Sequence, residues 1–154
     1  MQIDPTIFKA YDIRGIVGKT LTREVARQIG LSFGSAATEL GEKTIAVGRD
    51  GRLSGPDLIS GLVEGLRAAG LDVIDIGLVA TPMVYFATNI EFDGVRPTSG
   101  IMVTGSHNPP DYNGFKMVLA GKAIYGEQIQ ALRQRIEAGQ FSSGAGTYKQ
   151  VDVR

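Results

Sequence analysis

Residues 44–76, which read TIAVGRDGRLSGPDLISGLVEGLRAAGLDVIDI, contain the pattern that decides the fold. The apolar run 44–47 stops at a turn-rich segment with two glycines, and the run 71–76 is similar, so each predicts a buried strand. The apolar spacing between them is helical, and Ser54 with Asp57 three residues later predicts a capping box at the start of that helix. Strand, helix and strand form a βαβ unit, whose two strands should be parallel with a right-handed crossover.

The alternation of strands and helices continues on both sides of this unit. Before it, apolar residues at helical spacing predict a helix over residues 22–40 that ends at Gly41. After it, Thr81 and Pro82 predict the start of another helix, because proline at the first helical position has no N–H to leave unpaired. A third strand is expected over residues 99–103.

A short loop makes the predicted sheet mixed. Residues 104–114 leave too little chain for a helical crossover between strand 99–103 and strand 115–119, so these two strands should pair antiparallel. A last helix, with apolar residues at helical spacing, ends before Gly139. We therefore predict an α/β fold, a three-layer αβα sandwich with a mixed, mostly parallel sheet and one antiparallel strand.

The chain of 154 residues, 43% of them hydrophobic, is of a size that fits one domain. We expect this domain to span residues 1–140. Residues 141–146, FSSGAG, are typical of a flexible linker, and residues 148–154 form a short polar tail. We therefore expect residues 141–154 to be a linker towards a missing second domain of a longer protein.

The composition excludes several classes of function. Sixteen basic and sixteen acidic residues leave no net charge, so the broad positive field of a non-specific nucleic-acid binder is missing and no nucleic-acid partner is expected. The absence of cysteine excludes disulfides and thiol catalysis, and fits a reducing compartment. No signal peptide and no apolar run of roughly 20 residues is present. We expect a soluble, cytoplasmic protein with no membrane partner.

Three loops should lie where an open α/β sheet binds its ligands, beyond the carboxyl ends of the parallel strands. They are residues 48–52, 77–81 and 104–114. The third contains Ser106, and Lys116 follows close behind it in the returning strand. Two arginines of the first loop, a lysine and loop amides around a hydroxyl suit a phosphate better than an acyl group. Phosphoryl transfer is therefore the leading chemistry.

Each candidate also has a purely structural interpretation. Ser106 could be a polar residue of a proline-bounded turn, although a loop of roughly 10 residues in a compact domain is more often functional. His107 could be a solvated loop residue, and because it directly follows Ser106 it is poorly placed to act as that serine's base. Lys116 could be an ordinary solvated strand lysine. The charged residues of the segment 48–52 could be surface charges and a turn cap.

Two familiar motifs are excluded. Residues 15–20, GIVGKT, end like a phosphate-binding loop but are two residues too short. Ser106 lacks the glycines of a nucleophile elbow, since Thr104 and Asn108 occupy those places. The sequence therefore favours neither a nucleoside triphosphatase nor an α/β-hydrolase.

Four motifs occur together along the chain. They are FKAYDIRG at residues 8–15, GRD at 48–50, TGSHNP at 104–109 and NGFK at 113–116. In this order they closely resemble the bacterial phosphomannomutase/phosphoglucomutases of the α-D-phosphohexomutase superfamily. The hexapeptide around Ser106 is highly specific for that superfamily, and the resemblance spans essentially the whole chain.

The resemblance implies a four-domain isomerase that interconverts hexose 1-phosphate and hexose 6-phosphate by phosphoryl transfer. Ser106 matches a serine that is phosphorylated at rest and donates its phosphoryl group to the sugar, so that a hexose 1,6-bisphosphate forms as intermediate and activator. Lys116 matches a proposed general acid/base. Tyr11 and Arg14 match residues near the phosphoserine and the substrate.

The resemblance also implies further binding residues, a metal ion, substrates and further domains. His107 matches a residue that flanks the serine, and Arg49 is expected to bind substrate phosphate. Mg²⁺ is expected on the phosphate of Ser106, with its remaining ligands in a missing domain, because the chain has no Asp-x-Asp-x-Asp segment. The substrates are expected to be mannose and glucose phosphates. Without the remaining domains of the parent chain, we expect little or no activity.

Two other classes of function stay open. A non-catalytic module that binds a sugar phosphate or another anion could keep the Ser106 loop without its catalytic partners. An assembly domain tethered by its Ser/Gly-rich end is a further alternative, for which the composition gives no positive support.

Overall fold

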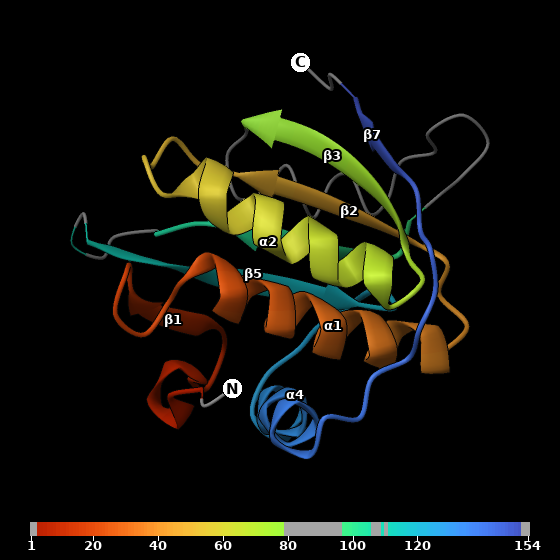
Figure 1. Cartoon of the computed structure of the whole chain (residues 1–154), viewed down its shortest axis with the longest axis horizontal. Helices are drawn as coiled ribbons and strands as arrows, with labels where there is room; N and C mark the ends of the chain where they lie inside the picture. The colour runs from red at the N-terminus through yellow and green to blue at the C-terminus, as the bar shows by residue number, and fades with distance from the viewer. Residues whose placement is uncertain (1–2, 79–96, 106–108, 110, 152–154) are drawn as a thin grey trace.

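The structure is a computed structural model that describes residues 3–78, 97–105, 109 and 111–151. Its elements follow the predicted alternation of strands and helices (Figure 1). In chain order they are η1 (Pro5–Ile7), β1 (Ile13–Ile16), α1 (Arg23–Glu39), β2 (Thr44–Arg49), α2 (Gly55–Ala68), β3 (Asp72–Leu78), β4 (Ser99–Val103), β5 (Tyr112–Leu119), β6 (Lys122–Ala123), α4 (Glu127–Ala138) and β7 (Tyr148–Gln150).

The seven strands that the structure describes form one sheet in the order β1-β5-β4-β2-β3-β7, with β6 paired to β5. The pairs β2–β3, β2–β4 and β3–β7 are parallel. Strand β5 is antiparallel to β1, β4 and β6, and is therefore the one strand that runs against the others. The predicted mixed, mostly parallel sheet with one antiparallel strand is confirmed.

Helices α1 and α2 lie side by side over the same face of the sheet (Figure 1). Glycines allow their close approach: a Cβ added to Gly30 would overlap the carbonyl oxygen of Leu62, and one added to Gly65 would overlap that of Arg27. The backbones of the two helices are thus in direct contact at these positions. Among the residues that the structure describes, no helix is long and apolar enough to cross a membrane.

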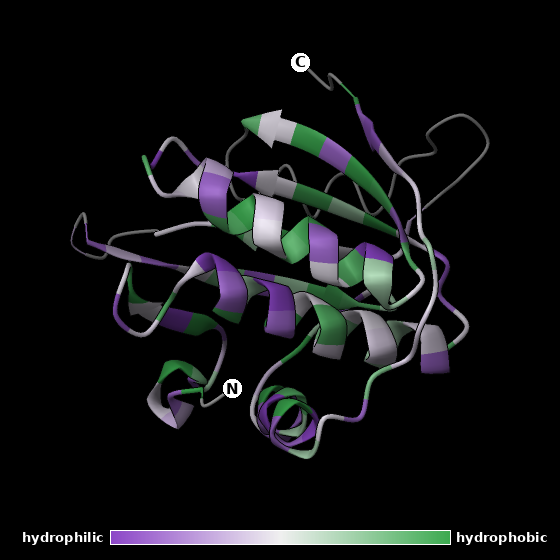
Figure 2. Cartoon of the chain, in the orientation of Figure 1, coloured by the Kyte–Doolittle hydropathy of each residue, from purple (hydrophilic) through white to green (hydrophobic). Residues whose placement is uncertain are grey.

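The hydrophobic core fills the space between these helices and the sheet. Phe33 of α1 and Leu62 of α2 are fully buried there, against Val47 of β2 and Phe115 of β5. Figure 2 shows hydrophobic segments along both β2 and β3. The opposite face of the sheet is also buried, at positions that alternate with these: Ala46, Ile74, Met102 and Val118. The helix predicted from Thr81–Pro82 lies outside the described residues.

The capping box predicted for α2 is wrong. Ser54 makes no side-chain cap bond, and its backbone is already helical, with φ −76° and ψ −12°. The chain enters α2 through a turn in which Gly55 N donates to Arg52 O, so the Ser54 hydroxyl does not face the first-turn amides. That hydroxyl instead accepts a hydrogen bond of 2.8 Å from Asn113 Nδ2 of β5.

Two strands differ from the prediction at the β1 edge of the sheet. Residues 13–16, which the sequence did not indicate as a strand, form β1, whose residue Gly15 pairs with Asn113. Strand β5 begins at Tyr112, three residues before the predicted start, because pairing with β1 holds its first residues in the sheet. The loop between β4 and β5 is correspondingly shorter than predicted.

The segment expected to be a linker is an ordered part of the surface up to residue 151, the last that the structure describes. Ser142 donates from its backbone N to Ser35 Oγ at 2.8 Å and from its hydroxyl to Ala69 O at 2.7 Å. Gly146 lies so close to Leu71 that an added Cβ would overlap the Leu71 carbonyl. Residues 148–150 then form β7, in parallel with β3. Small residues here serve close packing, and the expected boundary at residue 140 stays a prediction.

Candidate functional site

Ser106 and His107 lie outside the described residues, but both ends of their loop are described. Val103 at the end of β4 pairs with Phe115 of β5. One residue further, Thr104 N donates to Gly114 O at 2.9 Å. The two strands therefore bring the ends of the loop together at the carboxyl end of β4.

The carboxylate of Asp50 holds the first end of the loop. Asp50 follows β2, the parallel neighbour of β4, and its backbone N donates to Val103 O at 3.0 Å. Its Oδ2 accepts two hydrogen bonds of 2.9 Å, from the Thr104 hydroxyl and from Gly105 N. Its Oδ1 accepts a bond of 3.2 Å from Arg52 N, which closes the turn after β2.

The guanidinium of Arg52 holds the second end. Its Nη1 donates to Pro109 O at 2.6 Å and to Tyr112 O at 3.1 Å, and its Nε lies 3.9 Å from Asp50 Oδ2. A Cβ added to Gly105 would overlap the Arg52 side chain, so a larger residue at that position would displace the guanidinium. From the sequence, Arg52 is a candidate hydrogen-bond donor to phosphate or a surface charge, and Asp50 is a possible turn cap. We call the two side chains together the Asp50–Arg52 latch.

Lys116 lies on the side of β5 that faces away from the core between helices and sheet, as predicted. Its neighbours Phe115 and Met117 are buried in that core, whereas Lys116 is half-buried. Together with Tyr11 and Asp12, it lines a cavity of about 240 Å³. The structure therefore brings the predicted residues Tyr11 and Lys116 to one place.

A second tyrosine borders this cavity and was missed from the sequence. Tyr125 follows β6 and is 62% exposed, and Tyr11 on the other side is 78% exposed. The two segments are joined because Gly126 N donates to Ala10 O at 2.7 Å. No local pattern marks Tyr125 in the sequence, since its proximity to Tyr11 depends on the pairing of β6 with β5.

Arg14 lies next to this group. It pairs with Gly114 across the β1–β5 ladder and shares with Lys116 one face of the sheet, two residues along β5. Its Nε donates to Asp12 Oδ1 at 3.1 Å, and its side chain is 40% exposed. The two cations and Tyr11 thus lie along the same side of the β1–β5 pair.

Arg49 lies elsewhere, on the side of the sheet that α2 covers. Its Cδ lies 3.4 Å from the position that a Cβ on Gly55 would occupy. Its positive charge also acts on Tyr148: burial and the hydrogen bond to Asp75 raise the pKa of that phenol, and Arg49 partly offsets them. The structure does not bring Arg49 together with Lys116.

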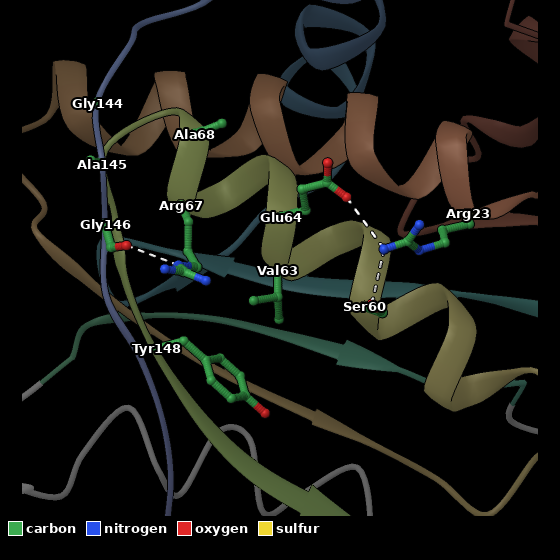
Figure 3. Close-up of a pocket in the computed structure, with 10 residues that line it drawn as sticks. All are labelled: Arg23, Ser60, Val63, Glu64, Arg67, Ala68, Gly144, Ala145, Gly146 and Tyr148. Atoms are coloured by element: carbon green, nitrogen blue, oxygen red, sulfur yellow. Dashed lines mark hydrogen bonds and ion pairs between the residues drawn. The ribbon is translucent and has the colours of Figure 1, made fainter.

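A cavity of about 640 Å³ lies between the start of α1, helix α2 and residues 144–148 (Figure 3). Its polar groups bind each other: Arg67 Nε donates to Gly146 O at 2.8 Å, and Arg23 Nη2 lies 3.4 Å from Glu64 Oε2. These contacts attach the C-terminal segment and α1 to α2. Their function is therefore structural.

Metal-binding side chains do not gather in the part of the chain that the structure describes. Within residues 3–78, 97–105, 109 and 111–151, no group of three or more histidine, aspartate or glutamate side chains could hold a metal ion. These residues alone do not form a site for the Mg²⁺ expected from the sequence.

Comparisons with known proteins agree on one family. The sequence pattern of the phosphoglucomutase/phosphomannomutase alpha/beta/alpha domain I matches residues 5–143. The chain is 55% identical over 148 residues to a Pseudomonas aeruginosa phosphomannomutase/phosphoglucomutase, covering 96% of this chain and 31% of that protein. It is 52% identical over 149 residues to a Neisseria meningitidis phosphoglucomutase, covering 96% and 32%. The chain thus spans about a third of these relatives.

A solved structure shows the same fold. A Burkholderia thailandensis protein of the phosphoglucomutase/phosphomannomutase family superposes with a TM-score of 0.96 at 57% identity, over 99% of this chain and 34% of that one.

Proposed function

This chain belongs to the phosphoglucomutase/phosphomannomutase family as its first domain, and we propose that it carries the phosphoserine of a hexose phosphate mutase. The proposed enzyme interconverts the 1-phosphates and 6-phosphates of mannose and glucose. Its remaining domains are supplied by the parent chain, since the relatives are about three times as long.

One observation carries the proposal. The family match covers residues 5–143, and it includes the TGSHNP loop, whose two ends are held beside the end of β4 by the latch. Parallel α/β sheets bind phosphates at this end of their strands, where loop amides and helix N-termini provide donors. Phosphoryl transfer depends mainly on positioning and on stabilising charge, so a serine without a histidine base is sufficient.

The proposed reaction has two balanced halves. In the first, a sugar hydroxyl oxygen attacks the phosphorus on Ser106; the P–O bond to the serine breaks, a P–O bond to the sugar forms, and Lys116 relays the hydroxyl proton to the departing serine oxygen. This gives the hexose 1,6-bisphosphate. In the second half Ser106 Oγ attacks the other phosphate, the P–O bond between that phosphate and the sugar breaks, and Lys116 relays the serine proton to the sugar oxygen. The serine ends as it began, phosphorylated.

The other residues support binding and charge in this scheme. Tyr11 contacts the sugar beside Lys116, with which it shares a cavity, and Arg14 and His107 contact phosphate oxygens. Arg49 lies on the other side of the sheet, and its proposed contact with substrate phosphate rests on the sequence alone. When bound, Mg²⁺ would neutralise part of the phosphoserine charge, and we propose that its protein ligands lie in the remaining domains. The charged substrates and the lack of cysteine fit a cytoplasmic enzyme.

Mass spectrometry of Ser106 tests the proposal. The full-length protein that carries this domain is incubated with a hexose 1,6-bisphosphate and Mg²⁺, and intact mass and peptide mapping follow the gain of one phosphate. We expect that phosphate on Ser106, and none in the Ser106→Ala variant.

The same experiment separates the alternatives. A protein that binds hexose phosphate and never exchanges phosphate on Ser106 is a non-catalytic binding module, and the mutase proposal would then be wrong. If the protein neither binds hexose phosphate nor exchanges phosphate on Ser106, the remaining alternative is an assembly domain. Run in parallel on residues 1–154 alone, the experiment should show little or no turnover.

A further inference from the structure

The Asp50–Arg52 latch contacts both ends of the loop that carries Ser106 in the sequence. Asp50 accepts from Thr104 and Gly105, the two residues before the serine, and Arg52 donates to Pro109, three residues after it. The two side chains are themselves an ion pair at 3.9 Å. Both are largely shielded from solvent, with 25% of the Asp50 side chain and 18% of the Arg52 side chain exposed.

We propose that Asp50 and Arg52 are positioning residues of the phosphoryl transfer. They set the distance between the two ends of the loop and thereby the place from which the Ser106 hydroxyl reacts. The inference rests on the proposed function for its chemistry and on the described contacts for its geometry. Neither residue is assigned a contact with the substrate.

The latch resists deformation because its bonds are charge-assisted and share atoms. One carboxylate oxygen, Asp50 Oδ2, accepts from both a side chain and a backbone N, so moving the turn after β2 moves the first end of the loop. One guanidinium nitrogen, Arg52 Nη1, donates to Pro109 and Tyr112, so the same turn also moves the second end. Hydrogen bonds with a charged partner are about twice as strong as neutral ones.

Gly105 is the point where the two halves of the latch meet. Its amide donates to Asp50, and its missing side chain leaves the space that Arg52 fills. An alanine at this position would push the guanidinium away from Pro109. The glycine immediately before the reacting serine is thus explained by the latch, without any need for an unusual backbone angle.

Four variants of the full-length protein test the inference by kinetics. Arg52→Met and Asp50→Asn should lower kcat about 100-fold, because displacements near 1 Å have effects of that order, while KM changes by less than about 3-fold. Arg52→Lys keeps the charge and three donors, so it should recover about 10-fold of the loss. Arg67→Met is the matched control. Arg67 lies in the last turn of α2 and also donates to a backbone carbonyl, that of Gly146. Arg67→Met should lower Tm as much as Arg52→Met does and leave kcat unchanged.

Amide hydrogen exchange gives a readout that does not depend on turnover. Asp50→Asn should speed the exchange of the Gly105 amide about 10-fold or more and leave the amide of Phe33 in the core unchanged. Because this measurement uses Asp50→Asn, the test stays valid if Arg52→Met folds poorly.

The outcomes separate the inference from the proposed function. Equal kcat values in Arg52→Met and Arg67→Met, or unchanged Gly105 exchange in Asp50→Asn, would overturn the latch as a positioning device. If wild-type protein takes no phosphate on Ser106, the proposed function fails, and the positioning inference fails with it even where the exchange data show the latch. Phosphate on wild-type Ser106 combined with full kcat in both latch variants would refute the inference alone.

Discussion

Tyr148 Oη lies 2.7 Å from Asp75 Oδ2 and donates a hydrogen bond to it. Asp75 is buried in β3, and Tyr148 is the first residue of β7, so this bond attaches the last strand to the sheet. Asp75 also accepts a bond of 2.8 Å from Gly77 N. The carboxylate thus depends on the phenol for one of its partners in the folded state.

Loss of this bond should destabilise β7. Tyr148→Phe removes one donor to a buried carboxylate, and we expect a cost of about 1 kcal/mol in the free energy of unfolding. Urea denaturation at pH 7 measures it. Tyr125→Phe, which changes an exposed tyrosine in the same way, should cost nothing, and an equal loss in both variants would contradict the prediction.

The same bond predicts a dependence on alkaline pH. Burial, followed by the bond to Asp75, raises the pKa of Tyr148 above its usual value of 10.0. A folded-state pKa above the unfolded one gives stability that is fully present below pH 10 and is lost as pH rises through the folded pKa. Wild-type protein should therefore lose more stability than Tyr148→Phe between pH 9 and pH 11, measured by urea denaturation.

Glu24 predicts the opposite dependence, at acid pH. Hydrogen bonds from Arg27, and then from Gln28, lower the pKa of Glu24 from 4.5 to about 2. The stability that these hydrogen bonds contribute through ionised Glu24 is present above pH 4.5 and is lost as pH falls towards 2. Because about half of the Glu24 side chain is exposed, 49%, the contribution should stay below about 1 kcal/mol. Glu24→Gln and Arg27→Gln should both reduce the difference in stability between pH 6 and pH 3.

The contact between α1 and α2 should not tolerate a side chain at Gly65. Gly65→Ala forces a Cβ into the carbonyl of Arg27, and we expect a loss of about 2–3 kcal/mol in the free energy of unfolding. Gly51→Ala is the matched control, because nothing lies within 4 Å of the added Cβ there. Denaturation by urea compares the two, and an unaffected Gly65→Ala variant would mean that the helices can separate at little cost.

Lys116 should affect turnover much more than folding. If it moves the sugar proton, Lys116→Met in the full-length protein should lower kcat at least about 100-fold and leave phosphate on Ser106 detectable by mass spectrometry. Lys122→Met changes an exposed lysine of β6 and should behave like wild type. Full turnover in Lys116→Met would exclude the acid/base role.

The repeating part of the fold was predictable because it depends on local periodicity. The spacing of apolar residues alone locates α1, α2 and the central strands, and a short loop correctly implied that β5 is antiparallel. Strands β1 and β7 were not found because each is four residues or fewer and is defined by its partner. Ile13 of β1 and Tyr148 of β7 are in strands only because Phe115 and Val73 lie beside them.

In the candidate site, too, features that follow from a local pattern were predictable and features that depend on distant contacts were not. The side of β5 on which Lys116 lies follows from strand alternation, which the sequence already shows. The Asp50–Arg52 latch joins residues more than 50 positions apart, and no short-range pattern indicates that. The turn assignment of Asp50 was correct for its Oδ1, which binds Arg52 N, and incomplete for its Oδ2.

These sequence separations have a consequence for the order of folding. Asp50 and Gly105 are 55 residues apart, and Arg52 and Pro109 are 57 apart, so closing either contact costs considerable chain entropy. The central strands have to pair first, because the Asp50 amide finds Val103 O only in the register of β2 with β4. The ends of the reactive loop therefore come together late, after most of the sheet has formed. A nascent chain released before β5 is complete would lack the strand that joins β1 to β4, and its serine would have no organised surroundings.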